Sequence, residues 1–92
     1  MLLSDIASQQ RKMADGIAQL LARRALLLSQ RENLAEDLLV QQNKLGAETS
    51  ETSRQILRDI VENIITQQQA TEAALINVND MLALEYVISN MN

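Results

Sequence analysis

KLGAETSETSRQIL, residues 44–57, is the stretch least typical of a helix in a chain otherwise rich in helix-forming residues. Gly46 follows the last leucine of a long apolar repeat, where a left-handed C-cap is expected, and Lys44 suits the negative end of a helix dipole. Downstream, the spacing of Thr52 and Gln55 matches a capping box, which begins a new helix. A stop signal, a short polar run and a start signal together predict that the chain folds back here.

The alternative is one continuous helix of roughly 130 Å, at a rise of 1.5 Å per residue. Ala47, Glu48 and Glu51 are compatible with such a rod. Short connections between helices are common, so the hairpin is the favoured interpretation. We therefore expect a single domain over residues 1–92, with a helix over about 4–45, a turn over about 46–52 and a second helix over about 53–89.

Both flanks of this stretch carry apolar residues in alternating steps of three and four, the pattern of a helix that packs along a seam. A β-strand would need strict alternation, so both flanks are predicted to be helical. The expected fold class is an all-α, antiparallel, coiled-coil-like hairpin of two long helices. The predicted seam core is Ile6, Met13, Ile17, Leu20, Leu27, Leu34 and Leu38 in the first helix, and Leu57, Val61, Ile64, Leu75 and Val78 in the second.

The composition narrows the chemistry that the chain can perform. Its 92 residues include no Pro, Cys, His, Trp or Phe, and Tyr86 is the one aromatic residue. The absence of Cys excludes disulfides and thiolate metal sites. Without His or Cys, the candidates for catalysis are carboxylates, lysines and Tyr86. Carboxylate pairs such as Asp59 with Glu62 are interpreted as solvated helix faces, so we expect no enzyme activity, cofactor, metal site or small-molecule substrate.

The charge distribution disfavours a nucleic-acid partner. The chain has a net charge of −4, and the basic residues between positions 11 and 31 do not share one helical face. An RNA-binding helical-hairpin dimer therefore remains a disfavoured alternative. No apolar run approaches the ~18 residues of a membrane span, and the opening MLLSDIA does not resemble a secretory signal. We expect a cytoplasmic chain with no membrane span.

The predicted hairpin has more apolar surface than two helices can cover. Four helices can close such a core, so we expect the hairpin to complete a four-helix bundle, either by dimerisation or by binding a helical partner. The open end, where the two chain termini meet, is apolar around more than one face, as interaction sites often are. The residues expected to contact a partner are Leu3, Met81, Leu82, Tyr86, Val87 and Ile88.

These features predict a non-enzymatic protein–protein interaction module, a small acidic helical chaperone or assembly adaptor that covers the apolar helical surface of a partner. A structural subunit of a larger helical assembly and the RNA-binding dimer are the alternatives. The short, acidic, aromatic-poor and all-helical character is similar to that of small chaperones and co-chaperones of bacterial secretion systems, and equally to small phage or assembly adaptors. This likeness lies in composition and shape rather than in particular residues.

Overall fold

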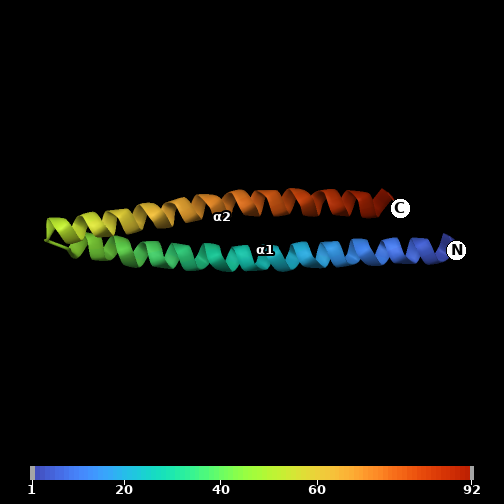
Figure 1. The fold of residues 1–92 in the computed structure, drawn as a ribbon, viewed down its shortest axis with the longest axis horizontal. Helices are drawn as coiled ribbons and strands as arrows, with labels where there is room; N and C mark the ends of the chain where they lie inside the picture. Colours follow the sequence, from blue (N-terminus) through green and yellow to red (C-terminus); the bar gives the residue numbers. More distant parts are fainter. Residues whose placement is uncertain (1, 92) are drawn as a thin grey trace.

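The computed structural model describes residues 2–91, and the side chains of residues 5–91, as two long antiparallel helices (Figure 1). Helix α1 spans Leu2–Ala47 and helix α2 spans Glu51–Met91. The molecule measures 73 × 14 × 14 Å, with a radius of gyration of 20.8 Å, whereas a compact chain of this length would have about 12 Å. The predicted all-α antiparallel hairpin is confirmed, and the continuous rod is wrong.

The turn is shorter than the sequence predicts. Helix α1 continues through Gly46 to Ala47, and no described glycine has a positive φ, so the predicted left-handed cap at Gly46 is wrong. The turn comprises residues 48–50 instead of 46–52. The carboxylate of Glu48 closes it, because its Oε1 accepts hydrogen bonds from the backbone N–H groups of Thr49 (3.0 Å) and Ser50 (2.9 Å).

Helix α2 begins earlier than predicted, and its cap is Ser50. The Ser50 Oγ accepts from the backbone N–H of Ser53 (3.5 Å), and its carbonyl accepts from that of Arg54 (2.9 Å). The capping box predicted for Thr52 and Gln55 is wrong, since Thr52 already lies inside the helix. Several N-cap residues follow one another here, and the one nearest the turn satisfies the free amides first.

Removing the Ser50 cap should lower the stability of the hairpin. We expect Ser50→Ala to reduce the free energy of unfolding by about 1 kcal/mol, because the first turn of α2 loses a side-chain acceptor. Thr52→Ala is the matched control and should change stability by less than about 0.5 kcal/mol. Thermal unfolding followed by circular dichroism measures both. A larger loss for Thr52→Ala would restore the sequence-based assignment of the cap.

Gly46 offers a second test of the turn. The residue is helical, and a Cβ added to it would meet no atom within 4 Å. Gly46→Ala should therefore raise the free energy of unfolding by about 0.5–1 kcal/mol, because Ala restricts the unfolded chain and favours helix. The expected change in calorimetry is a rise of a few degrees in the unfolding temperature. A fall would mean that Gly46 needs a left-handed backbone after all.

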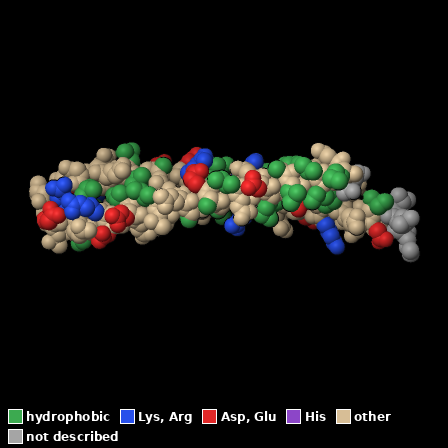
Figure 2. All heavy atoms as spheres, turned by 90° about the horizontal axis from the view of Figure 1, so that it is seen from above, with side chains coloured by type: hydrophobic (Ala, Val, Ile, Leu, Met, Phe, Trp, Pro, Cys, Tyr) green, Lys and Arg blue, Asp and Glu red, His purple; other side chains and the backbone are tan. Residues whose placement is uncertain are grey.

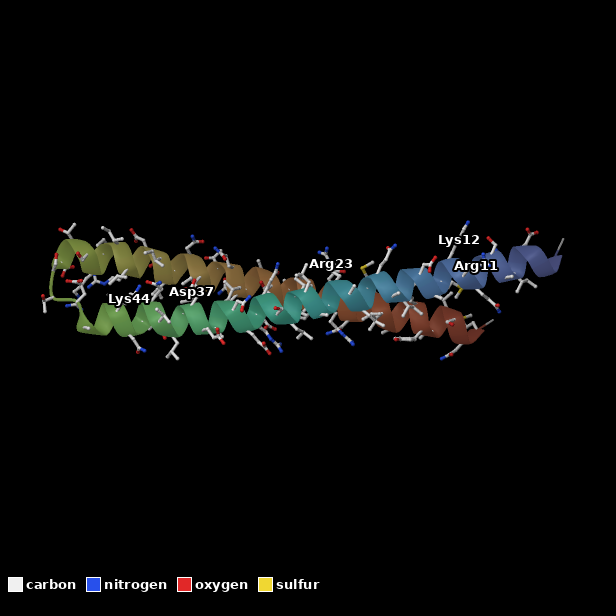
Figure 3. The ribbon with its side chains drawn as sticks, turned by 90° about the horizontal axis from the view of Figure 1, so that it is seen from below. Arg11, Lys12, Arg23, Asp37 and Lys44 are labelled. Carbon is white, nitrogen blue, oxygen red and sulfur yellow. The ribbon has the colours of Figure 1, made fainter. Side chains whose placement is uncertain are left out.

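The core is a narrow seam between the helices, which cross in the view of Figure 3 as the strands of a coiled coil do. Five apolar side chains are buried among the described residues. Four of them form one cluster, with Ile17, Leu20 and Ala74 packed against it. The buried apolar residues are Leu27 in α1 and Ile64, Leu75, Val78 and Leu82 in α2.

The structure places most of the predicted seam residues between the helices. Leu27, Ile64, Leu75 and Val78 are buried. The half-buried ones are Met13, Ile17, Leu20, Leu34, Leu38, Leu57 and Val61. Ile6 differs, because its side chain is 50% exposed. Helix α1 has 46 residues and α2 has 41, so the start of α1 extends past the end of α2, which cannot cover Ile6 (Figure 1).

Two polar features accompany the seam. Thr71 is buried within it, and its Oγ1 donates to the carbonyl of Gln67 (2.9 Å), so the hydroxyl is satisfied within α2. Arg31 Nη1 lies 3.5 Å from Glu72 Oε1 and joins the two helices. Both side chains of this ion pair are about half exposed, so the pair contributes less than about 1 kcal/mol. Apolar packing along the seam therefore holds the hairpin together.

Candidate protein-binding surfaces

The hairpin leaves most of its large apolar side chains in contact with solvent. Sixteen of those described are at least about a third exposed, against five that are buried. The accessible surface is 6937 Å², whereas a compact protein of this mass would expose about 5,400 Å². Figure 2, which views the molecule from the side of α2, shows hydrophobic side chains at the surface along its length. Surface of this kind usually marks an interaction site.

One exposed apolar stripe runs along α1 beside the seam. Its members follow one another in steps of four and three, so they share one face of the helix. Glu32 is the one charged residue that interrupts this spacing. The remaining members are all exposed, and we call them the α1 stripe: Ala14, Ala18, Leu21, Ala25, Leu28, Ala35 and Leu39.

A second stripe follows the same spacing along α2. All its members except Ala74, which is half-buried, are exposed. We call them the α2 stripe: Ile56, Ile60, Asn63, Gln67, Ala70, Ala74, Asn77, Met81, Leu84 and Ile88.

The α2 stripe carries no charge, although α2 is a charged helix. The eight charged residues of α2 all lie on its other faces: Glu51, Arg54, Arg58, Asp59, Glu62, Glu72, Asp80 and Glu85. Solvent-exposed helix faces ordinarily hold charged residues. Ten successive positions without charge therefore distinguish this face from an ordinary solvent-exposed helix face.

The two stripes lie on opposite sides of the hairpin. Three surface hollows run along the side of the α2 stripe, and α1 contributes Arg23, Gln30 and Lys44 to them. Arg23 and Lys44 lie along one edge of α1 (Figure 3). Leu21, on the α1 stripe, is two residues from Arg23 and so about 160° away around the helix. Each side of the molecule therefore presents one stripe.

The residues predicted to contact a partner are distributed around α2 rather than gathered on one face. Met81 and Ile88 belong to the α2 stripe. Tyr86 is two residues from Ile88 and so points towards the opposite side, that of the α1 stripe. Val87 lies between these directions and faces away from α1. All four side chains are exposed, so the described open end is apolar on several faces.

Leu82 and Leu3, the other two predicted contact residues, differ from these four. Leu82 is 3% exposed and belongs to the core cluster, so its assignment to the exposed contact surface is wrong. It follows Val78 by four residues, which places both side chains on the seam. Leu3 lies outside the residues whose side chains the structure describes.

Reasoning from the sequence missed the two stripes as continuous surfaces. The signal was present in the charge pattern, because the positions without charge on α2 repeat every three or four residues over about nine turns. The small residues of both stripes, such as Ala18, Ala25 and Ala70, carry little hydrophobic weight individually, yet they let another helix approach closely.

Among residues 2–91, no group of three or more acidic, His or Cys side chains is arranged to hold a metal ion. Neither helix, over the same residues, contains a stretch long and apolar enough to cross a membrane. Comparisons with protein-family models, with curated proteins and with solved structures each found no match to this chain.

Proposed function

We propose that this chain is a non-enzymatic protein-binding module, a small helical chaperone or assembly adaptor that covers an apolar helical segment of a partner. The observation that supports the proposal is the α1 stripe, an exposed surface with the spacing of a helix-packing seam. Such surfaces bind amphipathic helices, which supply a complementary row of apolar side chains. The partner would be a protein segment that is itself poorly soluble when its apolar face is exposed.

The composition of the α1 stripe suits a helix more than an extended peptide. Ala14, Ala18, Ala25 and Ala35 are small and alternate with the larger Leu21, Leu28 and Leu39. Small residues let a second backbone approach, and leucines fill the spaces between the side chains of that helix. An extended peptide would instead need a sheet edge with unpaired backbone groups, which residues 2–91 do not provide.

Helix α2 adds apolar groups to the same side of the hairpin. Tyr86 points to this side, and Ile65 is three heptads from Tyr86 and so shares its face. Both side chains are exposed. A helix bound between the α1 stripe and these residues would contact both helices of the hairpin and complete a three-helix core. The proposed mechanism is therefore burial of the partner's apolar face along the length of α1.

A model client tests this proposal. The probe is a fluorescent 28-residue peptide with Leu at a/d spacing, alongside an isomer with the same residues in scrambled order. We expect the full chain to bind the patterned peptide, and Leu21→Gln with Leu28→Gln to weaken that binding about tenfold or more, because two leucine contacts are lost. Ala22→Gln with Ser29→Gln, one residue further round the exposed helix, should change it less than about twofold.

Fluorescence anisotropy measures these affinities, and circular dichroism checks that all variants remain helical. Equal affinity for the scrambled peptide would show that the hairpin binds apolar peptides regardless of the spacing of their leucines. Unchanged binding by the Leu21/Leu28 variant would show that the α1 stripe is not the binding site for the peptide.

The presence of stripes on opposite sides also supports the alternative of a structural subunit. Two independent helix-packing faces allow each hairpin to contact two neighbours and so build an extended assembly. Light scattering distinguishes this function, because the mass of a structural subunit should continue to grow with concentration beyond that of a dimer.

A further inference from the structure

We infer that the α2 stripe is the interface of an antiparallel homodimer, in which it packs against the α2 stripe of a second copy of this chain. This inference goes beyond the proposed function and does not depend on it, because client binding uses the opposite side of the hairpin. It rests on the order of residues along the stripe, on the position of the charges of α2 and on the size of the exposed surface.

The order of residue types along the α2 stripe is nearly the same when it is read from either end. Both of its ends are apolar, each end is followed inwards by an amide residue, and alanines occupy the centre. A two-fold axis turns one half of a surface onto the other half, so a homodimer interface must be complementary to itself in this way. A stripe adapted to an unrelated partner has no reason to be symmetric about its midpoint.

When the α2 helices of two copies pack antiparallel with the two-fold axis near residue 72, residues of similar chemical type face each other. Apolar residues meet at both ends, two amides meet between them, and two alanines meet beside the axis. In this register the pairs between one copy and the second copy are Ile56 with Ile88, Ile60 with Leu84, Asn63 with Met81, Gln67 with Asn77, and Ala70 with Ala74. The alanines sit where the helices are closest, and the amide pair can form hydrogen bonds that fix the register.

Antiparallel registers shifted by one heptad pair residues of less similar chemical type. A shift of one heptad in one direction places Gln67 against Leu84 and Asn63 against Ile88 of the second copy. A shift in the other direction places Asn77 against Ile60. Each buries an amide against an aliphatic side chain, which costs free energy when the amide has no partner. The matched register has one such mixture, Asn63 with Met81.

Antiparallel packing is also better than parallel packing for the charges beside the stripe. Parallel chains would bring Asp80 of one copy towards Glu85 of the second and would align the two helix dipoles. The antiparallel register instead places Asp80 near Thr66 of the second copy. It also joins the turn end of one hairpin to the open end of the other, so that Ile56 covers Ile88 at each end of the stripe.

The exposed area is sufficient for this dimer. The hairpin exposes 6937 Å², about 1,500 Å² more than a compact protein of its mass. A stable interface of standard size takes about 800 Å² from each partner. The packed stripe from residue 56 to residue 88 would extend over about 50 Å. A second copy can therefore cover the α2 side while the α1 stripe stays open for a client.

The first test is the mass of the chain in solution. Sedimentation equilibrium should give a dimer at micromolar concentration, and Ala70→Glu should weaken the dimer by about tenfold or more, because it places a carboxylate beside the axis. Ala83→Glu is the matched control: it adds the same charge to an exposed position on the outer face of α2, off the stripe and away from the axis, and should leave the dimer constant within about twofold. A wild-type chain that stays monomeric up to about 100 μM would overturn the inference and leave a foreign helix as the occupant.

Disulfide trapping tests the pairing without relying on a destabilising variant. The chain contains no Cys, so each introduced thiol is unique. A mixture of the Ile60→Cys and Leu84→Cys chains should form the mixed disulfide in preference to either symmetric one. Asp59→Cys mixed with Ala83→Cys, one residue away on each helix, should not form it efficiently. A dominant disulfide between two Ile60→Cys chains would indicate parallel packing and would overturn the antiparallel interface.

Discussion

Replacing Val78 with Asp should abolish the hairpin. Val78 is 2% exposed and lies in the cluster that Leu27, Leu75 and Leu82 form across the seam. A carboxylate there would have to remain unsolvated or to open the seam, and either outcome costs several kcal/mol. A chain of this size has roughly 5 kcal/mol or more of total stability. We therefore expect Val78→Asp to lose most of its helical circular dichroism at 25 °C.

Asn79→Asp is the control for this experiment, because it introduces the same carboxylate at the adjacent exposed position. It should keep its helicity and shift the unfolding temperature by no more than a few degrees. Retention of full helicity by Val78→Asp would show that the two helices do not depend on this seam. The antiparallel pairing of α1 and α2 would then need another explanation.

Leu82→Ala should cost about 2–4 kcal/mol of stability, the range for a leucine removed from a packed core. Leu82 is 3% exposed and belongs to the same cluster as Val78. For a domain of this size the loss corresponds to a fall of roughly 10 °C or more in the unfolding temperature. Val87→Ala, five residues along the helix at a 55% exposed position, should stay within about 0.5 kcal/mol of the wild type.

This pair of variants separates core from contact surface at the open end. All chains are compared at one concentration, since self-association adds to the apparent stability. If Leu82→Ala were as stable as Val87→Ala, Leu82 would be a surface residue, as the sequence alone suggested. If both were strongly destabilised, the whole end of α2 would be buried in the associated state.

The spacing of the apolar residues explains why the fold could be predicted from the sequence. Competition among several possible helix caps explains why the turn could not. The apolar spacing from Leu20 to Leu38 and from Leu57 to Leu82 permits helices and excludes strands, and a chain without proline has few places to break. The turn involves several competing caps within a few residues. Which serine or threonine caps α2 depends on how Glu48 folds over the backbone amides, and spacing rules do not contain that information.

For the candidate surfaces too, the sequence predicts one part and only the tertiary structure decides the rest. A heptad row marks Leu82 and Val78 as seam residues, yet a row at the end of a helix can also be read as an exposed patch until the partner helix is placed. The overhang of α1, which leaves Ile6 exposed, follows from where the turn falls. The two stripes become separate surfaces only when the direction of each helix face is known.

The amino-acid sequence by itself determined that this chain is helical, that it turns once and that its seam is built from aliphatic residues, because helix propensity and apolar periodicity act over neighbouring residues. The tertiary structure decided which aliphatic residues are buried and which remain in water, because a side chain is covered only when the opposite helix lies beside it. The register of two antiparallel helices therefore separates the core around Val78 from the stripes offered to other molecules.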